Sequence, residues 1–115
     1  MTMIRPGNKL AVGASEIHGR GVFAIAAIGA GEVVETCPVL RIPAAQLDAI
    51  DSTLVFEYYY AWDGDAGLAL GFGSLYNHSN TPNAAYEKQL ASDTLVIRAL
   101  NPIASGDEIT TSYSG

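Results

Sequence analysis

The sequence predicts a mostly β fold in a single domain. Its 115 residues suffice for one hydrophobic core but not for two. Short apolar stretches alternate with 12 glycines and 5 prolines, a pattern typical of short strands joined by turns. Because the predicted strands span only about three to six residues, they do not fit one long sheet. We therefore expect several small twisted sheets packed around a shared core.

Eight stretches have the composition of strands: residues 10–13, 21–24, 32–36, 39–42, 55–60, 68–70, 84–87 and 95–100. Branched and aromatic side chains between Val55 and Tyr60 favour a strand most strongly, because they pack well on a pleated surface. The helix candidate runs from Ala44 to about Asp51, with Pro43 in its first turn, where a missing N–H has no helical partner anyway. Residues 77–83 contain too many turn-forming residues for a regular element.

The composition indicates a folded, soluble, intracellular protein. Apolar residues make up 49% and charged residues 16% of the chain, which argues against disorder. No apolar run approaches the ~18 residues needed to span a bilayer, and the N-terminus lacks the pattern of a signal peptide. The one cysteine, Cys37, cannot form an internal disulfide, and no cysteine–histidine cluster has the spacing of a zinc site. Cys37 lies in an apolar stretch and is expected to be a small core residue.

The net charge of −6 is unevenly distributed along the chain. No basic residue lies between Arg41 and Lys88, whereas six acidic residues fall in that interval: Asp48, Asp51, Glu57, Asp63, Asp65 and Glu87. An acidic segment repels phosphate backbones and attracts lysine-rich partners. We therefore expect no direct binding of nucleic acid, and either a basic protein partner or simply a solvated acidic face.

Asn77 and His78 follow an apolar, glycine-spaced run and precede a sharp turn. Burying such polar side chains without partners costs several kcal/mol, on the order of 2–7, so they are expected to lie at a site. The alternative is an asparagine that caps a turn and a histidine with its hydrogen bonds satisfied in the core.

Gly19-Arg20-Gly21 is the second motif. Its glycines let the backbone approach a ligand closely or adopt positive φ, although a short Gly-x-Gly is also typical of a hairpin turn. It is not a dinucleotide fingerprint, because the third glycine and the following helix pattern are missing.

Tyr113, near the chain end, closes the third motif, which begins at Ile103 and includes Gly106-Asp107-Glu108. Taken alone, a tyrosine so close to a terminus would be a surface residue. A functional role for Tyr113 is indicated only in combination with the two other motifs.

Together these motifs resemble those of the SET-domain protein lysine methyltransferases, most closely the small single-domain members of viruses and bacteria. Residues 18–24 with 28 and 31–33 are similar to the family's first motif, and residues 76–79 with 82–83 to its most recognisable one. Residues 103–113 are similar to the segment that ends in its catalytic tyrosine. The resemblance spans residues 10–115, nearly the whole chain.

The resemblance implies a SET-domain β-clip with a C-terminal pseudoknot, and it implies site residues. Those for the cofactor S-adenosylmethionine are His18, Gly19, Arg20, Gly21, Tyr76, Asn77, His78 and Tyr113. The implied catalytic residues are Tyr113 and Tyr58, and the residues implied to bind the substrate lysine are Tyr58, Tyr60 and Phe72. Tyr59 and Tyr60 are alternatives for the position of Tyr58, and Glu57 and Trp62 could line the same surface.

The implied reaction is methyl transfer to the side-chain amine of a lysine in a basic protein, histone-like or other. It requires no metal, and small relatives imply a homodimer. The resemblance implies that residues 1–115 form a single SET domain without the cysteine-rich segments that flank many relatives, and only two residues follow Tyr113. The alternative function is therefore a SET-fold module that binds cofactor or a lysine-containing peptide with little or no turnover. An unrelated β-clip structural protein would require all three motifs to be coincidental.

Overall fold

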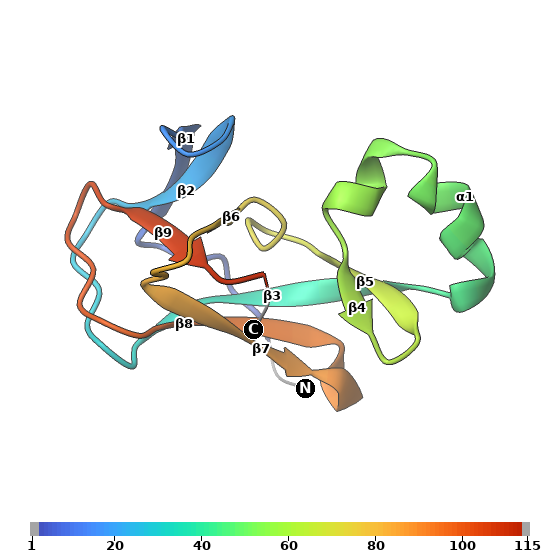
Figure 1. Ribbon diagram of the computed structural model, residues 1–115. Helices are drawn as coiled ribbons and strands as arrows, with labels where there is room; N and C mark the ends of the chain where they lie inside the picture. The colour runs from blue at the N-terminus through green and yellow to red at the C-terminus, as the bar shows by residue number, and fades with distance from the viewer. Residues whose placement is uncertain (1–2, 114–115) are drawn as a thin grey trace.

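A computed structural model, described for residues 3–113, shows two curled sheets and a short helical segment (Figure 1). The four-stranded sheet has the order β1-β2-β9-β6 and the five-stranded sheet the order β4-β5-β3-β8-β7. The strands are β1 (Leu10–Ala14), β2 (Arg20–Ala24), β3 (Val33–Ile42), β4 (Tyr60–Trp62), β5 (Asp65–Ala69), β6 (Asn77–His78), β7 (Ala84–Gln89), β8 (Thr94–Ala99) and β9 (Glu108–Thr111). The helical elements are η1 (Ala44–Gln46), α1 (Leu47–Asp51), η2 (Leu54–Glu57) and η3 (Leu90–Ser92). The predicted mostly β fold with one short helix is confirmed.

β3 is one strand of 10 residues, although the sequence predicted two short ones on either side of Pro38. Its first part, up to Pro38, pairs with β8, and its second part, from Val39, pairs with β5. Proline has no N–H to donate, and here it lies where the strand changes its partner. The long strand therefore joins two hairpins into one offset sheet.

The five-stranded sheet curls until its two edge strands approach each other. β4 and β7 lie at opposite edges, yet the rings of Tyr60 and Tyr86 meet edge to face with 5.1 Å between their centroids. Strands twist with a fixed hand, and the offset pairing of β3 adds to the curvature. The result is a concave surface with aromatic walls.

The C-terminal strand β9 lies between two segments that are distant in sequence. It pairs antiparallel with β2 and parallel with β6. Beyond β6, the Asn83 side chain donates to the Glu108 carbonyl at 2.9 Å and accepts from the Thr110 N–H at 2.9 Å. β9 is thus held between β2 on one side and residues 77–83 on the other, as the predicted pseudoknot requires, and Figure 1 shows β9 beside β6.

The prediction of a strand at residues 55–60 is wrong for residues 55–59. η2 occupies Leu54–Glu57, where the Thr53 hydroxyl accepts a hydrogen bond from the Val55 N–H, and β4 begins only at Tyr60. Branched and aromatic residues favour strands only where a neighbouring surface receives them. Here Leu54 is 70% and Phe56 55% exposed, so no sheet face receives them. The helix predicted from Ala44 is present as η1 followed by α1.

The core lies between the sheets and contains Cys37 and Trp62, both fully buried. Burial raises the pKa of the Cys37 thiol far above its usual range, so the predicted core role of Cys37 is confirmed. The indole N–H of Trp62 donates to the Asp93 carboxylate at 2.9 Å, and Arg41 donates to the same carboxylate at 3.0 Å. Trp62 is thereby fixed inside the sheet, and it does not line a binding surface.

Asp93→Asn tests how much this carboxylate stabilises the fold. The Trp62 indole and then the Arg41 guanidinium hold the pKa of Asp93 below its usual value. The ionised group therefore stabilises the protein above the unfolded pKa of about 3.9, and this stabilisation is lost as the pH falls through the lower folded pKa. Asparagine keeps the acceptor for Trp62 and tolerates the φ of 48° at this position.

We expect the variant to be less stable than the native protein at neutral pH and the difference to narrow in acid. Urea unfolding of the variant and the native protein at about pH 7 and about pH 3, on either side of the unfolded pKa, measures the stability difference at each pH. A stability difference that does not change with pH would show that the charge of Asp93 contributes nothing.

Candidate functional site

Two cavities meet at one wall of the molecule. The first, which we call the loop cavity, has a volume of about 490 Å³ and reaches the β1–β2 connection at His18, Gly19 and Arg20. The second, the sheet cavity, has a volume of about 360 Å³ and extends between β4 and β7. Five residues line both cavities and form what we call the shared wall: Glu57, Tyr58, Ser74, Tyr76 and Tyr113. Two ligands, one in each cavity, could therefore meet at this wall.

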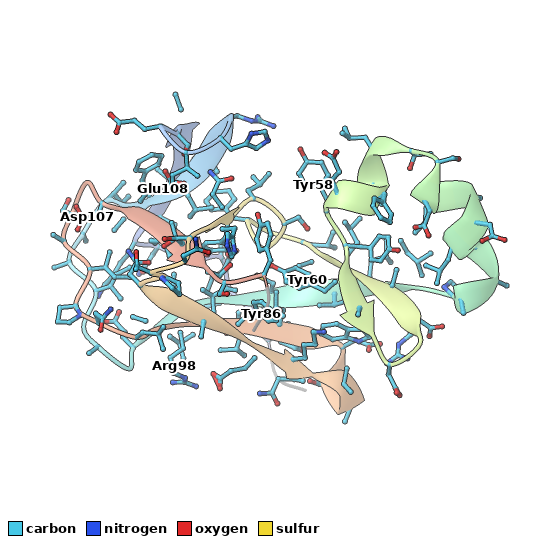
Figure 2. All side chains as sticks on the ribbon, viewed as in Figure 1. Tyr58, Tyr60, Tyr86, Arg98, Asp107 and Glu108 are labelled. Atoms are coloured by element: carbon cyan, nitrogen blue, oxygen red, sulfur yellow. The ribbon has the colours of Figure 1, made fainter. Side chains whose placement is uncertain are left out.

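Aromatic side chains dominate the sheet cavity. Tyr58, Tyr60 and Tyr86 all line it, and Figure 2 labels them, Tyr58 directly after η2, Tyr60 on β4 and Tyr86 on β7. The Tyr60 hydroxyl donates to the Gly73 carbonyl at 2.9 Å, and burial raises its pKa well above the usual value. The cavity therefore presents phenol hydroxyls and ring faces, which suit an alkyl chain that ends in an amine or a cation.

Tyr113 is held at both its backbone and its hydroxyl. Its N–H donates to Nδ1 of His78 at 2.9 Å, and its hydroxyl donates to the Tyr76 carbonyl at 2.8 Å. Because Nδ1 of His78 accepts, the ring proton of the neutral imidazole is on Nε2, which then donates to Asn80 at 3.0 Å. Partial burial of the side chain raises the pKa of Tyr113, so its hydroxyl remains a neutral donor at physiological pH.

Asn77 ties the β1–β2 connection to the C-terminal strand. Its amide nitrogen lies 3.1 Å from Ser15 Oγ, 3.1 Å from the His18 carbonyl, 3.0 Å from the Arg20 carbonyl and 2.8 Å from Glu108 Oε2. Ser15 in turn donates to the other Glu108 oxygen at 2.6 Å. This network fixes the backbone wall of the loop cavity, and two of its members, Ser15 and Glu108, were not predicted as site residues.

Gly21 packs directly against this network. A Cβ there would lie 2.8 Å from Cδ of Glu108 and 2.9 Å from the amide nitrogen of Asn77. Glu108 cannot swing aside freely, because both its carboxylate oxygens accept hydrogen bonds. At Gly13, on the neighbouring strand β1, a Cβ would make only an ordinary contact of 3.6 Å with the Phe23 ring.

Gly21→Ala is therefore expected to lower the free energy of unfolding by about 1–3 kcal/mol, as overpacking does. Gly13→Ala in the same hairpin is the matched control, and its change should stay within about 0.5 kcal/mol. Urea unfolding of both variants measures the difference. Equal stabilities would contradict the role given to Gly21.

The buried carboxylate of Glu35 accepts a hydrogen bond from Tyr76, a residue of the shared wall. Glu35 is only 5% exposed, and it accepts from the Tyr76 hydroxyl at 2.7 Å and from the Phe72 N–H at 2.9 Å. Burial, and then the charge of Glu35, raise the pKa of Tyr76 far above its usual value. Glu35 was not predicted as a site residue either; its signal in the sequence is a single carboxylate that follows Val33 and Val34 in a predicted strand.

The structure brings most of the predicted site residues together. The loop cavity is lined by His18, Gly19, Arg20, Tyr58, Tyr76, Asn77 and Tyr113, and the sheet cavity adds Tyr60. Three predicted residues line neither cavity. Gly21 packs against Asn77 and Glu108, and His78 accepts the N–H of Tyr113. Phe72 lies at a separate cavity of about 240 Å³ that residues 4–7 help to form. Phe72 therefore does not line the aromatic channel that the resemblance assigned to it.

Two further searches of residues 3–113 bear on the class of site. No three side chains of histidine, cysteine, aspartate or glutamate in this range are grouped so that they could hold a metal ion. No helix in the same range is long and apolar enough to cross a membrane.

The chain matches known proteins over nearly its whole length. The SET domain family matches residues 19–114. A histone-lysine N-methyltransferase of Schizosaccharomyces pombe, named as H3 lysine-37 specific, is 36% identical over 101 residues, which are 86% of this chain and 69% of that protein. The crystal structure of a candidate histone methyltransferase of Plasmodium falciparum superposes with a TM-score of 0.74 and 32% identity, covering 96% of this chain and 95% of the other.

The matched range contains all five residues of the shared wall. It also contains Gly21, Asn77 and Glu108, whose contacts shape the loop cavity. The part of the chain that carries the site is thus the part that these proteins share, and by sequence and fold this protein belongs to the SET-domain family of protein lysine methyltransferases.

Proposed function

We propose that this protein transfers a methyl group from S-adenosylmethionine to the side-chain amine of a lysine in a basic protein. The observation that carries the proposal is the shared wall, where Tyr58, Tyr76 and Tyr113 separate two cavities of molecular size. A donor in one cavity and an acceptor in the other would meet there in a fixed orientation, and positioning of this kind is a large part of catalysis in two-substrate reactions.

The residues of the loop cavity fit S-adenosylmethionine. Its volume of about 490 Å³ lies within the range of small-molecule sites. The guanidinium of Arg20 suits a carboxylate, and the tyrosine faces of the shared wall suit a sulfonium cation. Asn77 acts by fixing the backbone of residues 18–20, and His78 acts by holding Tyr113. When bound, the cofactor would supply a methyl carbon that a neutral amine can attack in line, with the thioether as the leaving group.

The sheet cavity would bind the lysine side chain and prepare its amine. A lysine ammonium has an unperturbed pKa of about 10.4, and entry between Tyr58 and Tyr60 disfavours the charged form because water is removed. The Tyr113 hydroxyl donates its hydrogen bond to the Tyr76 carbonyl, so the lone pairs of its oxygen are free to accept an N–H of the amine. The tyrosine thereby orients the amine, and the released proton leaves to solvent through the open side of the cavity.

Charge supports a basic protein as substrate. The net charge is −6, and the segment that contains β4, β5 and α1 has no lysine or arginine between Arg41 and Lys88. Glu57 extends this acidic character to the shared wall. Opposite charges steer encounter and favour the right partner. The Schizosaccharomyces pombe relative is named for a histone lysine, and we propose a histone or a similarly basic protein for this chain as well.

The test is methyl transfer from labelled S-adenosylmethionine to core histones, together with calorimetric titration of the cofactor. Label on histone lysines is the expected result. Cofactor binding without label on any lysine-rich protein would instead support the binding-module alternative, and no cofactor binding would overturn the proposal. The homodimer implied by the resemblance stays a prediction, which light scattering can check.

A further inference from the structure

One of the chain's own lysines lies at the sheet cavity. The sequence contains only two lysines, Lys9 and Lys88. Lys88, on β7, lines the same cavity as Tyr58, Tyr60 and Tyr113. Side chains two residues apart on a strand point to the same face, so Lys88 projects from β7 beside Tyr86, whose ring contacts Tyr60.

The two lysines differ in what holds them. Lys9 forms an ion pair with Glu32 at 2.8 Å and also donates to the Ala27 carbonyl. Ion pairs within residues 3–113 involve Lys9, Arg41 and Arg98, and Lys88 forms none with these residues. Its side chain is exposed and has a flexible four-carbon stem. No ion pair must therefore be broken for its amine to turn toward the shared wall.

We propose that Lys88 is itself a substrate of the site and accepts a methyl group in cis. This inference rests on the proposed function. The Lys88 amine first loses a proton to solvent; its nitrogen then forms a bond to the methyl carbon while the carbon–sulfur bond of S-adenosylmethionine breaks. The bonding electrons stay on sulfur, and S-adenosylhomocysteine leaves.

The aromatic wall gives a reason for the modified side chain to remain in place. Once charged again, a methylated lysine ammonium is attracted to ring faces, as in aromatic cages for methyl-lysine. The ring centroids of Tyr60 and Tyr86 lie 5.1 Å apart in the cavity that Lys88 lines. A methylated Lys88 would therefore oppose the entry of a substrate lysine, so self-methylation would inhibit the same site.

The test incubates the full chain with labelled S-adenosylmethionine and maps the methyl group by peptide mass spectrometry. Core histones are present in a parallel reaction. We expect the methyl group on Lys88, at an initial rate per molecule that does not change with protein concentration. Lys88→Arg should lower self-labelling about tenfold or more, and Lys9→Arg, the matched control, should leave it unchanged.

The other outcomes are distinguishable. Label on histones with none on Lys88, or self-labelling at Lys9, would overturn the inference and leave the proposed function standing. A rate per molecule that rises with protein concentration would show transfer between two copies and overturn the cis reaction. Label on neither the chain nor the histones would overturn the proposed function and the inference together.

Discussion

Tyr113→Phe is expected to lower methyl transfer about a hundredfold or more, because loss of orientation at the reacting atoms has effects of that size. The substitution removes only the hydroxyl that donates to the Tyr76 carbonyl and that would accept the substrate amine. Tyr113 is 60% exposed, so the loss of one neutral hydrogen bond should change the free energy of unfolding by only about 0.5–1.5 kcal/mol. Initial rates with labelled cofactor and urea unfolding measure the two effects separately.

Tyr59→Phe is the matched control. The Tyr59 hydroxyl donates to Asp51 at 2.8 Å, away from the shared wall, although Tyr59 also lines the sheet cavity. Transfer should therefore change little in this variant. Equal losses in Tyr113→Phe and Tyr59→Phe, or no loss in either, would remove Tyr113 from its proposed role.

The motifs were visible in the sequence, but the contacts that organise them were not. Asn77 and His78 stand in a stretch of turn-forming residues, and we expected no regular element there. They form a strand because Thr110 and Thr111, more than thirty residues later, pair with them in parallel. No local pattern can predict such a pairing, since it depends on a partner that the fold supplies.

The supporting carboxylates illustrate the same limit. Glu35 contacts Tyr76 and Glu108 contacts Ser15, across 41 and 93 positions of sequence. A carboxylate in an apolar run signals that some partner exists, but the sequence does not say which one. Phe72 shows the opposite error, because the resemblance implied a channel residue and its side chain packs against the core.

Glu35→Ala is expected to have the largest effect on stability. It would leave the buried Tyr76 hydroxyl and the part-buried Phe72 N–H without their acceptor. Each such donor costs about 1–3 kcal/mol, so the free energy of unfolding should fall by about 2–6 kcal/mol, out of the 5–15 kcal/mol that is usual for a domain. Urea unfolding measures this loss. Glu35→Gln keeps the shape of the side chain and one carbonyl oxygen, so its free energy of unfolding should fall clearly less than that of Glu35→Ala.

A double-mutant cycle separates support of Tyr76 from support of the fold in general. If Glu35 acts on the shared wall through the Tyr76 hydroxyl, Glu35→Gln and Tyr76→Phe should be coupled by about 0.5–3 kcal/mol in stability. The Tyr76 carbonyl holds the Tyr113 hydroxyl, so both single variants should also slow transfer more than they weaken cofactor binding. Additive stability changes would show that Glu35 and Tyr76 act independently. A fall in cofactor affinity alone would mean that Glu35 shapes the loop cavity rather than the position of Tyr113.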